Sequence, residues 1–169
     1  MSMRGEAGLR ADLKALAIPF KHHEHDAVFT VAESRGVKNA IPGEHTKNLF
    51  LKDAGGAFWL VTVPAEMRVD LKALPQAIGC KRVSFGKPED MERLLGVSPG
   101  SVTPLGAIHA EPGAIAVVLD EGLAQAEIVN VHPLRNTATI GLSGADLLRL
   151  LVHWGHAPQV ADIPVQEPQ

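Results

Sequence analysis

Residues 46–63 read TKNLFLKDAGGAFWLVTV, in which two runs of strand-forming residues flank a short turn. Thr46–Lys52 and Ala57–Val63 are rich in β-branched and aromatic residues, which strands favour. Asp-Ala-Gly-Gly at residues 53–56 has the turn residues that join two antiparallel strands. This stretch therefore predicts a β-hairpin, the clearest local structure in the chain.

Side-chain alternation along the first strand of this hairpin places Lys47 on the same face as Leu49 and Leu51. Asn48 and Lys52 then lie on the opposite face. If the leucine face is the core, Lys47 points inward at its rim. Such a lysine either extends its amine to solvent or holds a polarised or negatively charged oxygen of a substrate.

The remaining elements are predicted from hydrophobic periodicity, helix caps and turn residues. Helices are expected at Leu9–Ile18, Thr30–Gly36, Asp70–Ile78, Glu89–Leu95 and Ser143–Trp154. Strands are expected at Phe20–Val28, Arg82–Phe85, Ile115–Leu119, Ile128–Val131 and Asn136–Leu142.

Helices and strands are intermixed in this order without a regular alternation, which favours an α+β (mixed α/β) single domain. We expect a curved or barrel-like mixed β-sheet with helices packed around it. Residues 1–160 form this domain in our prediction, and residues 161–169 form a C-terminal tail. The tail belongs to a longer segment, Gly155–Gln169, that contains three prolines and is expected to be partly ordered.

The composition is that of a globular protein, with 46% hydrophobic and 21% charged residues in 169. Cys80 is the one cysteine, which excludes an intramolecular disulfide and fits a reducing, cytoplasmic location. No apolar run is long enough to span a membrane, and the N-terminal residues are typical of an amphipathic helix.

The charge is distributed unevenly along the chain. The segment Arg35–Arg93 contains ten basic and seven acidic residues, a net charge of +3, whereas the whole chain has a net charge of −3. A locally basic face on an acidic protein suits contact with a few phosphates. It does not suit the sequence-independent coating of DNA.

Two further motifs could contribute to a site. A Gly-x-x-x-Pro loop at 100–104 can present backbone N–H groups to a carbonyl oxygen, although most such patterns are plain turns. His132 ends an apolar strand just before Pro133, a position at which a histidine either serves a site or makes a structural hydrogen bond. Asn136 could orient a substrate or complete a turn.

Other candidate chemistry is weaker. The spacing of His22, His23 and His25 fits neither a helical pair of metal ligands nor a zinc set with cysteine, so we expect no metal. Cys80 follows a helix end and is interpreted as a small buried apolar residue. The sequence has no nucleotide-binding fingerprint, and we expect no cofactor.

The chain resembles the YbaK/ProX superfamily, which includes the editing insertion of bacterial prolyl-tRNA synthetases. The resemblance covers roughly residues 5–160 and is closest to the free-standing ProX-type branch. Its motifs are TKNLFLKD at 46–53, FWLVTV at 58–63, GSVTPL at 100–105 and NVHPL at 130–134 with Asn136-Thr137.

The resemblance implies a role for each matching residue. The family's near-invariant lysine falls on Lys47, which would be catalytic. Asn48, His132 and Asn136 would line the substrate pocket, and Lys52, Lys81 and Arg82 would contact the tRNA. The substrate loop of the family falls on Gly100, Ser101, Val102, Thr103 and Pro104.

The resemblance also implies an activity, the hydrolysis of the ester bond of a mischarged proline tRNA, above all Ala-tRNA(Pro). Two alternatives stay open: a Cys-tRNA(Pro) deacylase of the YbaK type, and a non-catalytic module that binds tRNA or a synthetase. The expected partners are the acceptor end of the tRNA and prolyl-tRNA synthetase. Either a monomer or a homodimer is compatible with the sequence.

Overall fold

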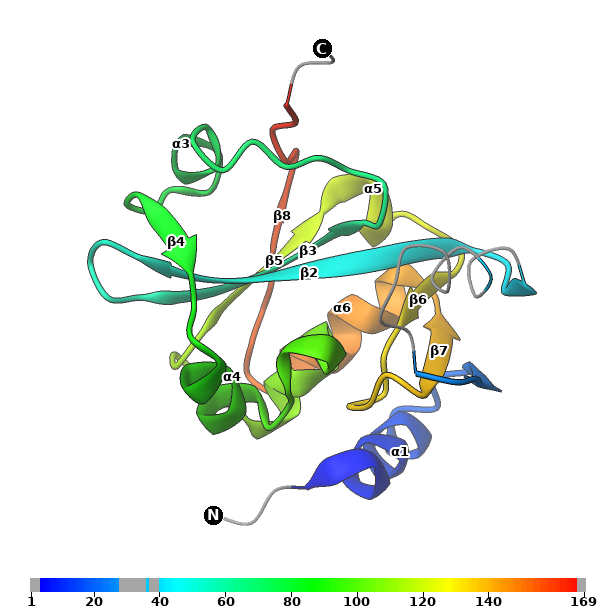
Figure 1. Cartoon of the computed structure of the whole chain (residues 1–169). Helices are drawn as coiled ribbons and strands as arrows, with labels where there is room; N and C mark the ends of the chain where they lie inside the picture. Colours follow the sequence, from blue (N-terminus) through cyan, green and yellow to red (C-terminus); the bar gives the residue numbers. More distant parts are fainter. Residues whose placement is uncertain (1–3, 28–35, 37–39, 167–169) are drawn as a thin grey trace.

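Two long strands, β2 (Glu44–Asp53) and β3 (Phe58–Pro64), form an antiparallel hairpin at the centre of the sheet. The side chain of Asp53 builds the connecting turn, because its Oδ1 accepts the backbone N–H groups of Gly55 and Ala57. The hairpin expected from residues 46–63 is therefore confirmed. Figure 1 shows it crossing the whole molecule.

The structure is a computed structural model that describes residues 4–27, 36 and 40–166. Its strands follow the order β1-β7-β6-β2-β3-β5-β8, with β4 paired to β2 beside this path. The pairs β2–β6, β3–β5 and β5–β8 are parallel and the others antiparallel. The other strands are β1 (Lys21–Glu24), β4 (Val83–Phe85), β5 (Ala116–Asp120), β6 (Val129–Val131), β7 (Ala138–Leu142) and β8 (Gln159–Ala161).

Helices pack on both sides of this sheet. Helices α1, α4 and α6 lie on one side of the β2–β3 ribbon, and α3 lies on the other (Figure 1). The helices are α1 (Gly5–Ala15), α3 (Leu74–Ile78), α4 (Pro88–Leu95), α5 (Glu121–Ala124) and α6 (Gly144–His153), with 3-10 turns η1 (Pro99–Ser101) and η2 (Pro104–His109). The mixed α/β single domain is confirmed. Its sheet is open, because β1 and β8 stand at opposite ends of the strand order.

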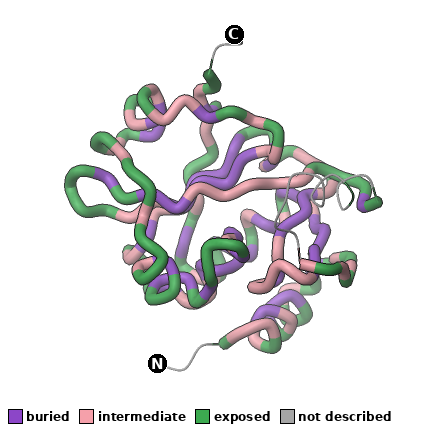
Figure 2. Tube along the Cα trace, in the orientation of Figure 1, coloured by how far each residue is buried: buried purple, intermediate pink, exposed green. Residues whose placement is uncertain are grey.

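The alternation of side chains along β2 divides the interior into two apolar clusters. Phe50 belongs to the larger cluster, which also holds the buried faces of α1, α4 and α6. Leu51 belongs to the smaller cluster, together with residues of α3 and Ile163 near the C-terminus. Figure 2 shows that buried positions concentrate in the central strands, whereas the tip of the hairpin is exposed. Each face of β2 therefore meets a different core.

Several elements differ in length from the sequence expectation. The helix expected from Asp70 begins only at Leu74, because Asp70 instead accepts the backbone N–H groups of Lys72 and Ala73 and closes a turn. Pro75 then occupies the first turn of α3, where its missing N–H costs nothing. Of the strand expected over Phe20–Val28, the structure forms β1, which ends at Glu24, and Val28 lies outside the described residues. The helix expected at Thr30–Gly36 lies, apart from its last residue, outside the described residues.

The segment after Gly155 is more regular than its prolines indicate. Its residues 159–161 form β8, which pairs in parallel with β5. Ile163 is 2% exposed and packs in the smaller apolar cluster, and Val165 forms a bridge with Val69. The fold therefore continues past residue 160, and Gln166 still donates a hydrogen bond to the backbone oxygen of Val69.

Candidate functional site

Strand β2 carries the two adjacent residues Lys47 and Asn48, whose positions are fixed by pairing with Val63 and Thr62 of β3. Because successive side chains of a strand point to opposite faces, these two residues serve different surroundings. Lys47 lies on the face of the smaller apolar cluster, and Asn48 lies on the face of the larger one.

The Asn48 amide ties β2 to the Gly-x-x-x-Pro loop. Its Nδ2 donates to the backbone oxygen of Val102 at 3.0 Å, and its Oδ1 accepts the hydroxyl of Thr62 at 2.6 Å. Both ends of the Asn48 amide therefore have a partner within the protein, and one of these partners, Thr62, is fully buried. Asn48 thereby fixes the distance between β2 and the loop.

The same loop is fixed to the end of β6 by Thr103. Its hydroxyl donates to the backbone oxygen of His132 at 2.7 Å and accepts the N–H of Leu105 at 3.2 Å. At the other end of the loop, Gly100 lies close to the side chain of Asn136. A β-carbon built onto Gly100 would be 3.6 Å from Nδ2 of Asn136. The structure thus brings together six residues expected at the site: Asn48, Gly100, Val102, Thr103, His132 and Asn136.

The His132 ring is held in one tautomer. Its Nδ1 lies 3.2 Å from the backbone oxygen of Ala138. A carbonyl oxygen can only accept, so Nδ1 carries the hydrogen and Nε2 is left as an acceptor in the neutral ring. Burial lowers the pKa of His132 below its ordinary 6.5, the hydrogen bond to Ala138 opposes this shift, and the nearby His25 adds to it. The ring is therefore neutral near pH 7.

Lys47 lines a recess of about 280 Å³ on the opposite face of β2. The recess lies between β2, β4, the segment after β3 and the C-terminal segment. It is lined by Lys47, Leu49, Arg68, Val69, Leu71, Phe85 and Gln166. The alternation predicted for Lys47 and Leu49 is confirmed. The described lining of this recess does not include the Gly100–Pro104 loop, which is tied to β2 through Asn48 on the other face.

An open stretch of the β2 edge lies between these two faces. On the edge away from β3, β6 pairs with β2 at Glu44 and His45, and β4 pairs with it from Leu51. In the described part of the chain, no strand pairs with residues 46–49 on this edge. A ligand that lay across this edge would reach Lys47 on one face and the Asn48 loop on the other.

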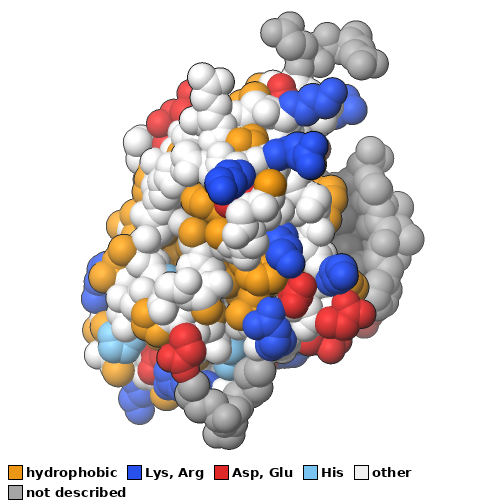
Figure 3. All heavy atoms as spheres, turned by 90° about the vertical axis from the view of Figure 1, so that its left-hand side faces the viewer, with side chains coloured by type: hydrophobic (Ala, Val, Ile, Leu, Met, Phe, Trp, Pro, Cys, Tyr) orange, Lys and Arg blue, Asp and Glu red, His pale blue; other side chains and the backbone are white. Residues whose placement is uncertain are grey.

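The residues expected to contact RNA lie around the hairpin and β4. The Nζ of Lys52 lies 5.4 Å from the centre of the Phe58 ring, which Arg93 approaches to 5.7 Å. Lys52 therefore lies on the face of β2 opposite to Lys47. Lys81 and Arg82 are exposed, immediately before β4. Figure 3, which views the molecule from this side, shows Lys and Arg side chains spread over the face with hydrophobic side chains between them.

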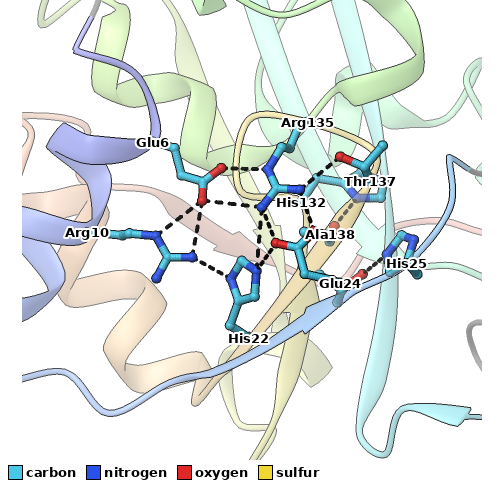
Figure 4. A network of polar contacts seen from close by, with 10 residues as sticks. Glu6, Arg10, His22, Glu24, His25, His132, Arg135, Thr137 and Ala138 are labelled. Atoms are coloured by element: carbon cyan, nitrogen blue, oxygen red, sulfur yellow. Dashed lines mark hydrogen bonds and ion pairs between the residues drawn. The ribbon is translucent and has the colours of Figure 1, made fainter.

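Arg135 was not predicted as a site residue, yet it anchors the turn between His132 and Asn136. Its guanidinium contacts Glu6 of α1 at 2.6 Å and Glu24 of β1 at 2.5 Å (Figure 4). Leu134 in this turn has a φ of 72°, a conformation that non-glycine residues rarely adopt and that surrounding contacts must stabilise. No local signal identifies Arg135, because its acidic partners are more than 100 residues away.

His22 and His25 make hydrogen bonds within the protein. Nδ1 of His22 accepts a hydrogen bond from Arg10, and its Nε2 faces Glu24, within the network drawn in Figure 4. Nε2 of His25 lies 2.8 Å from the hydroxyl of Thr139. Across residues 4–27, 36 and 40–166, three or more His, Cys, Asp or Glu side chains nowhere gather closely enough to hold a metal ion. None of the helices described there has the length and apolar character of a membrane span.

Comparisons with known proteins agree on one family. The sequence model of the aminoacyl-tRNA editing domain matches residues 25–150. Prolyl-tRNA editing protein ProX of Acetoanaerobium sticklandii is 34% identical over 152 residues, covering 89% of this chain and 93% of that protein. Prolyl-tRNA synthetase associated domain-containing protein 1 of Bos taurus is 38% identical over 157 residues, covering 90% and 91% respectively.

A solved structure described as a candidate trans-editing enzyme for prolyl-tRNA synthetase has the same fold. It superposes with a TM-score of 0.73 at 24% identity, over 98% of this chain and 100% of that one. The hypothetical protein APE2540 superposes with the same TM-score at 22% identity, over 92% and 97%.

Proposed function

Because the chain belongs to the aminoacyl-tRNA editing domain family, we propose that it is a free-standing deacylase that hydrolyses the ester of mischarged proline tRNA, with Ala-tRNA(Pro) as its substrate. The observation that carries this proposal is the β2 edge at residues 46–49, with which no strand of the described chain pairs. At this edge, only the thickness of one strand lies between the recess of Lys47 and the loop that Asn48 holds. The neutral His132 lies beside that loop.

In the proposed complex, the terminal adenosine of the tRNA lies across residues 46–49. The Lys47 ammonium holds its phosphate and adds positive potential near the ester. The aminoacyl group lies on the other face of β2, against the loop. There Ser101 donates its N–H to Ser98 and Pro104 has none, so the amides of Gly100, Val102 and Thr103 are the proposed donors to the ester carbonyl.

The hydrolytic step requires little from the protein beyond positioning. A water attacks the carbonyl carbon, with Nε2 of His132 as the proposed acceptor of its hydrogen bond. The bond to the ribose oxygen breaks, and the proton lost by the water passes to that oxygen. Free alanine and a tRNA with an unmodified 3′ end result. Holding the reactants in place in this way can lower the barrier by several kcal/mol.

The preference for alanine is a matter of size. A single methylene changes binding by only about 1–3 kcal/mol, so a pocket that admits alanine can exclude proline but discriminates weakly among small side chains. Contacts to the tRNA must therefore protect correctly charged alanine tRNA, and Lys52, Lys81 and Arg82 are the proposed contacts. Prolyl-tRNA synthetase is the proposed protein partner, supported by the name of the bovine relative.

The test is ester loss from proline tRNA charged with alanine, cysteine, serine or proline. We expect the alanyl ester to be hydrolysed fastest and the prolyl ester to be stable. A faster cysteinyl ester would instead assign the chain to Cys-tRNA(Pro), and rates equal to those in buffer for every ester would refute the deacylase activity.

Lys47→Ala separates an enzyme from a binding module. We expect kcat/KM for Ala-tRNA(Pro) to fall by about 100- to 1000-fold, because a preorganised charge near the reacting ester is lost. Lys14→Ala, which removes an exposed amine on α1, is the matched control and should retain the wild-type rate. Hydrolysis by the Lys47→Ala protein at the wild-type rate would contradict the role of Lys47.

A further inference from the structure

Phe85 is unusually exposed for an aromatic residue. Its relative accessibility is 64%, the highest among the large exposed hydrophobic residues of the described chain. It ends β4, where it pairs directly with Leu51 of β2. Directly paired residues of neighbouring strands share a face, so Phe85 lies on the same face as Leu51, Leu49 and Lys47. Phe85 is accordingly part of the lining of the Lys47 recess.

The surroundings of Phe85 are cationic. Lys47 and Arg68 line the recess with it, and none of the described lining residues is acidic. The β4 segment adds the exposed side chains of Lys81, Arg82 and Lys87. A flat apolar ring on a cationic surface matches a group that is itself flat and linked to negative charge. An unpaired nucleotide, with a base for the ring and a phosphate for the cations, has this chemistry.

The position of Phe85 also fits the proposed path of the RNA. Phe85 is level with Leu51, four residues along β2 from Lys47, which corresponds to about 13 Å at the rise of a β-strand. A short run of unpaired nucleotides can cover this span. The terminal adenosine would then lie at Lys47, and a nucleotide before it would lie at Phe85.

From this arrangement, which rests on the proposed function, we infer that Phe85 is a stacking platform for the base of an unpaired nucleotide that precedes the terminal adenosine of the tRNA. Phe85 is thus a positioning residue for the substrate. It directs the single-stranded 3′ end along the Lys47 face of β2, so that the ester reaches the open edge.

Protein docking explains this surface less well. A stable protein interface buries about 800 Å² on each partner around a centre depleted of charged residues, whereas here Lys47 and Arg68 line the recess together with Phe85 and three aliphatic side chains. A nucleotide needs only the ring face and a nearby positive charge. A protein partner at Phe85 is therefore an outcome that the experiment must be able to detect.

The test measures the binding of uncharged RNA, so it does not depend on catalysis. Two fluorescent acceptor-stem hairpins of proline tRNA are compared, one with its unpaired 3′ nucleotides and one blunt-ended. Phe85→Leu removes the ring face but keeps an apolar side chain, and Phe85→Trp enlarges the face. Val152→Ala, which shortens an exposed valine on α6, is the control.

We expect Phe85→Leu to weaken binding of the hairpin with unpaired nucleotides about 10-fold, within the range for losing one base–aromatic contact. Phe85→Trp should bind this hairpin at least as tightly as the wild type. Both Phe85 variants and the Val152→Ala control should bind the blunt hairpin as the wild type does. The logarithm of the RNA-binding constant should depend on the logarithm of salt concentration with the same slope in Phe85→Leu as in the wild type. Arg68→Ala should make this slope shallower by the amount expected for the loss of about one phosphate contact. In deacylation, the loss in Phe85→Leu should appear in KM.

Equal weakening of both hairpins, or no weakening of either, would overturn the inference. Loss of binding to prolyl-tRNA synthetase with RNA binding intact would assign Phe85 to protein docking instead. If Phe85→Leu binds RNA normally while the wild type edits Ala-tRNA(Pro), the stacking role fails and the proposed function stands. A wild type that binds the hairpin through Phe85 but hydrolyses no ester would leave the stacking role standing and refute the activity.

Discussion

The Nδ1 of His132 faces the backbone oxygen of Ala138, and this contact determines which ring nitrogen can accept a proton. The sequence showed where His132 stands, at the end of an apolar strand before a proline. It could not show the tautomer, because that depends on β7 folding back beside the ring. The alternation around Lys47 was predictable because it is local, whereas the side of β2 that the Gly100–Pro104 loop meets depends on a contact over 54 residues.

The pH dependence of deacylation should report the state of His132. Its pKa lies below 6.5, and the neutral ring is the form that accepts a hydrogen bond, so the rate should be constant above this pKa and fall below it. We expect the acid limb of kcat/KM, after subtraction of hydrolysis in buffer, to have its midpoint below pH 6.5. His132→Asn should abolish the limb and lower the plateau by about 100-fold. A midpoint above 6.5, or a limb that persists in His132→Asn, would exclude His132 from this role.

At the scale of elements, the turn between β6 and β7 is stabilised by its contacts to α1 and β1. Arg135 connects Glu6 and Glu24, and it lowers the pKa of Glu24 to about 2. Because this pKa is depressed in the folded protein, the ion pair stabilises fully above the ordinary value of 4.5 and is lost as the pH falls towards 2.

Hairpins and caps could be predicted from the sequence because their signals are local. This network could not, since three distant elements create it.

Arg135→Ala should release the turn that carries His132 and Asn136. We expect the pKa of Glu24, followed by NMR, to rise towards 4.5, and deacylation to slow by about 10-fold as the turn shifts. The melting temperature should fall by only a few degrees, because water screens ion pairs that are exposed to solvent. Arg149→Ala removes another partly exposed arginine ion pair, to Asp146, and should change neither the pKa of Glu24 nor the rate. Equal effects of the two substitutions would contradict a specific role for Arg135.

At the scale of the whole molecule, one open sheet separates two apolar clusters, and the C-terminal segment completes the smaller of them. The prolines of this segment suggested a tail. Its place in the sheet was not evident from the sequence, because β8 is short and pairs with β5, about 40 residues upstream. The mixed character of the sheet was predictable from the order of elements, but its openness depends on which strands become neighbours.

Ile163→Ala tests whether the C-terminal segment is part of the core. We expect the free energy of unfolding to fall by about 2–4 kcal/mol, since the side chain is almost fully buried. Val165→Ala, at a position that is 53% exposed, should change it by about 0.5 kcal/mol or less. Denaturant unfolding of both variants measures the difference, and equal stability of the two would show that Ile163 contributes nothing to the core.

The pairing of β2 with β6 has a consequence for the newborn chain. Glu44 lies beside Val129, so the framework around Lys47 and Asn48 pairs with the strand that leads to His132, and this strand is made late in translation. While the ribosome is still synthesising the residues between them, β2 has its hairpin partner β3 but lacks β6. Such long-range pairings form slowly and leave strand edges accessible meanwhile. A nascent chain halted before β6 would therefore possess the lysine and the hairpin, yet have no competent editing site.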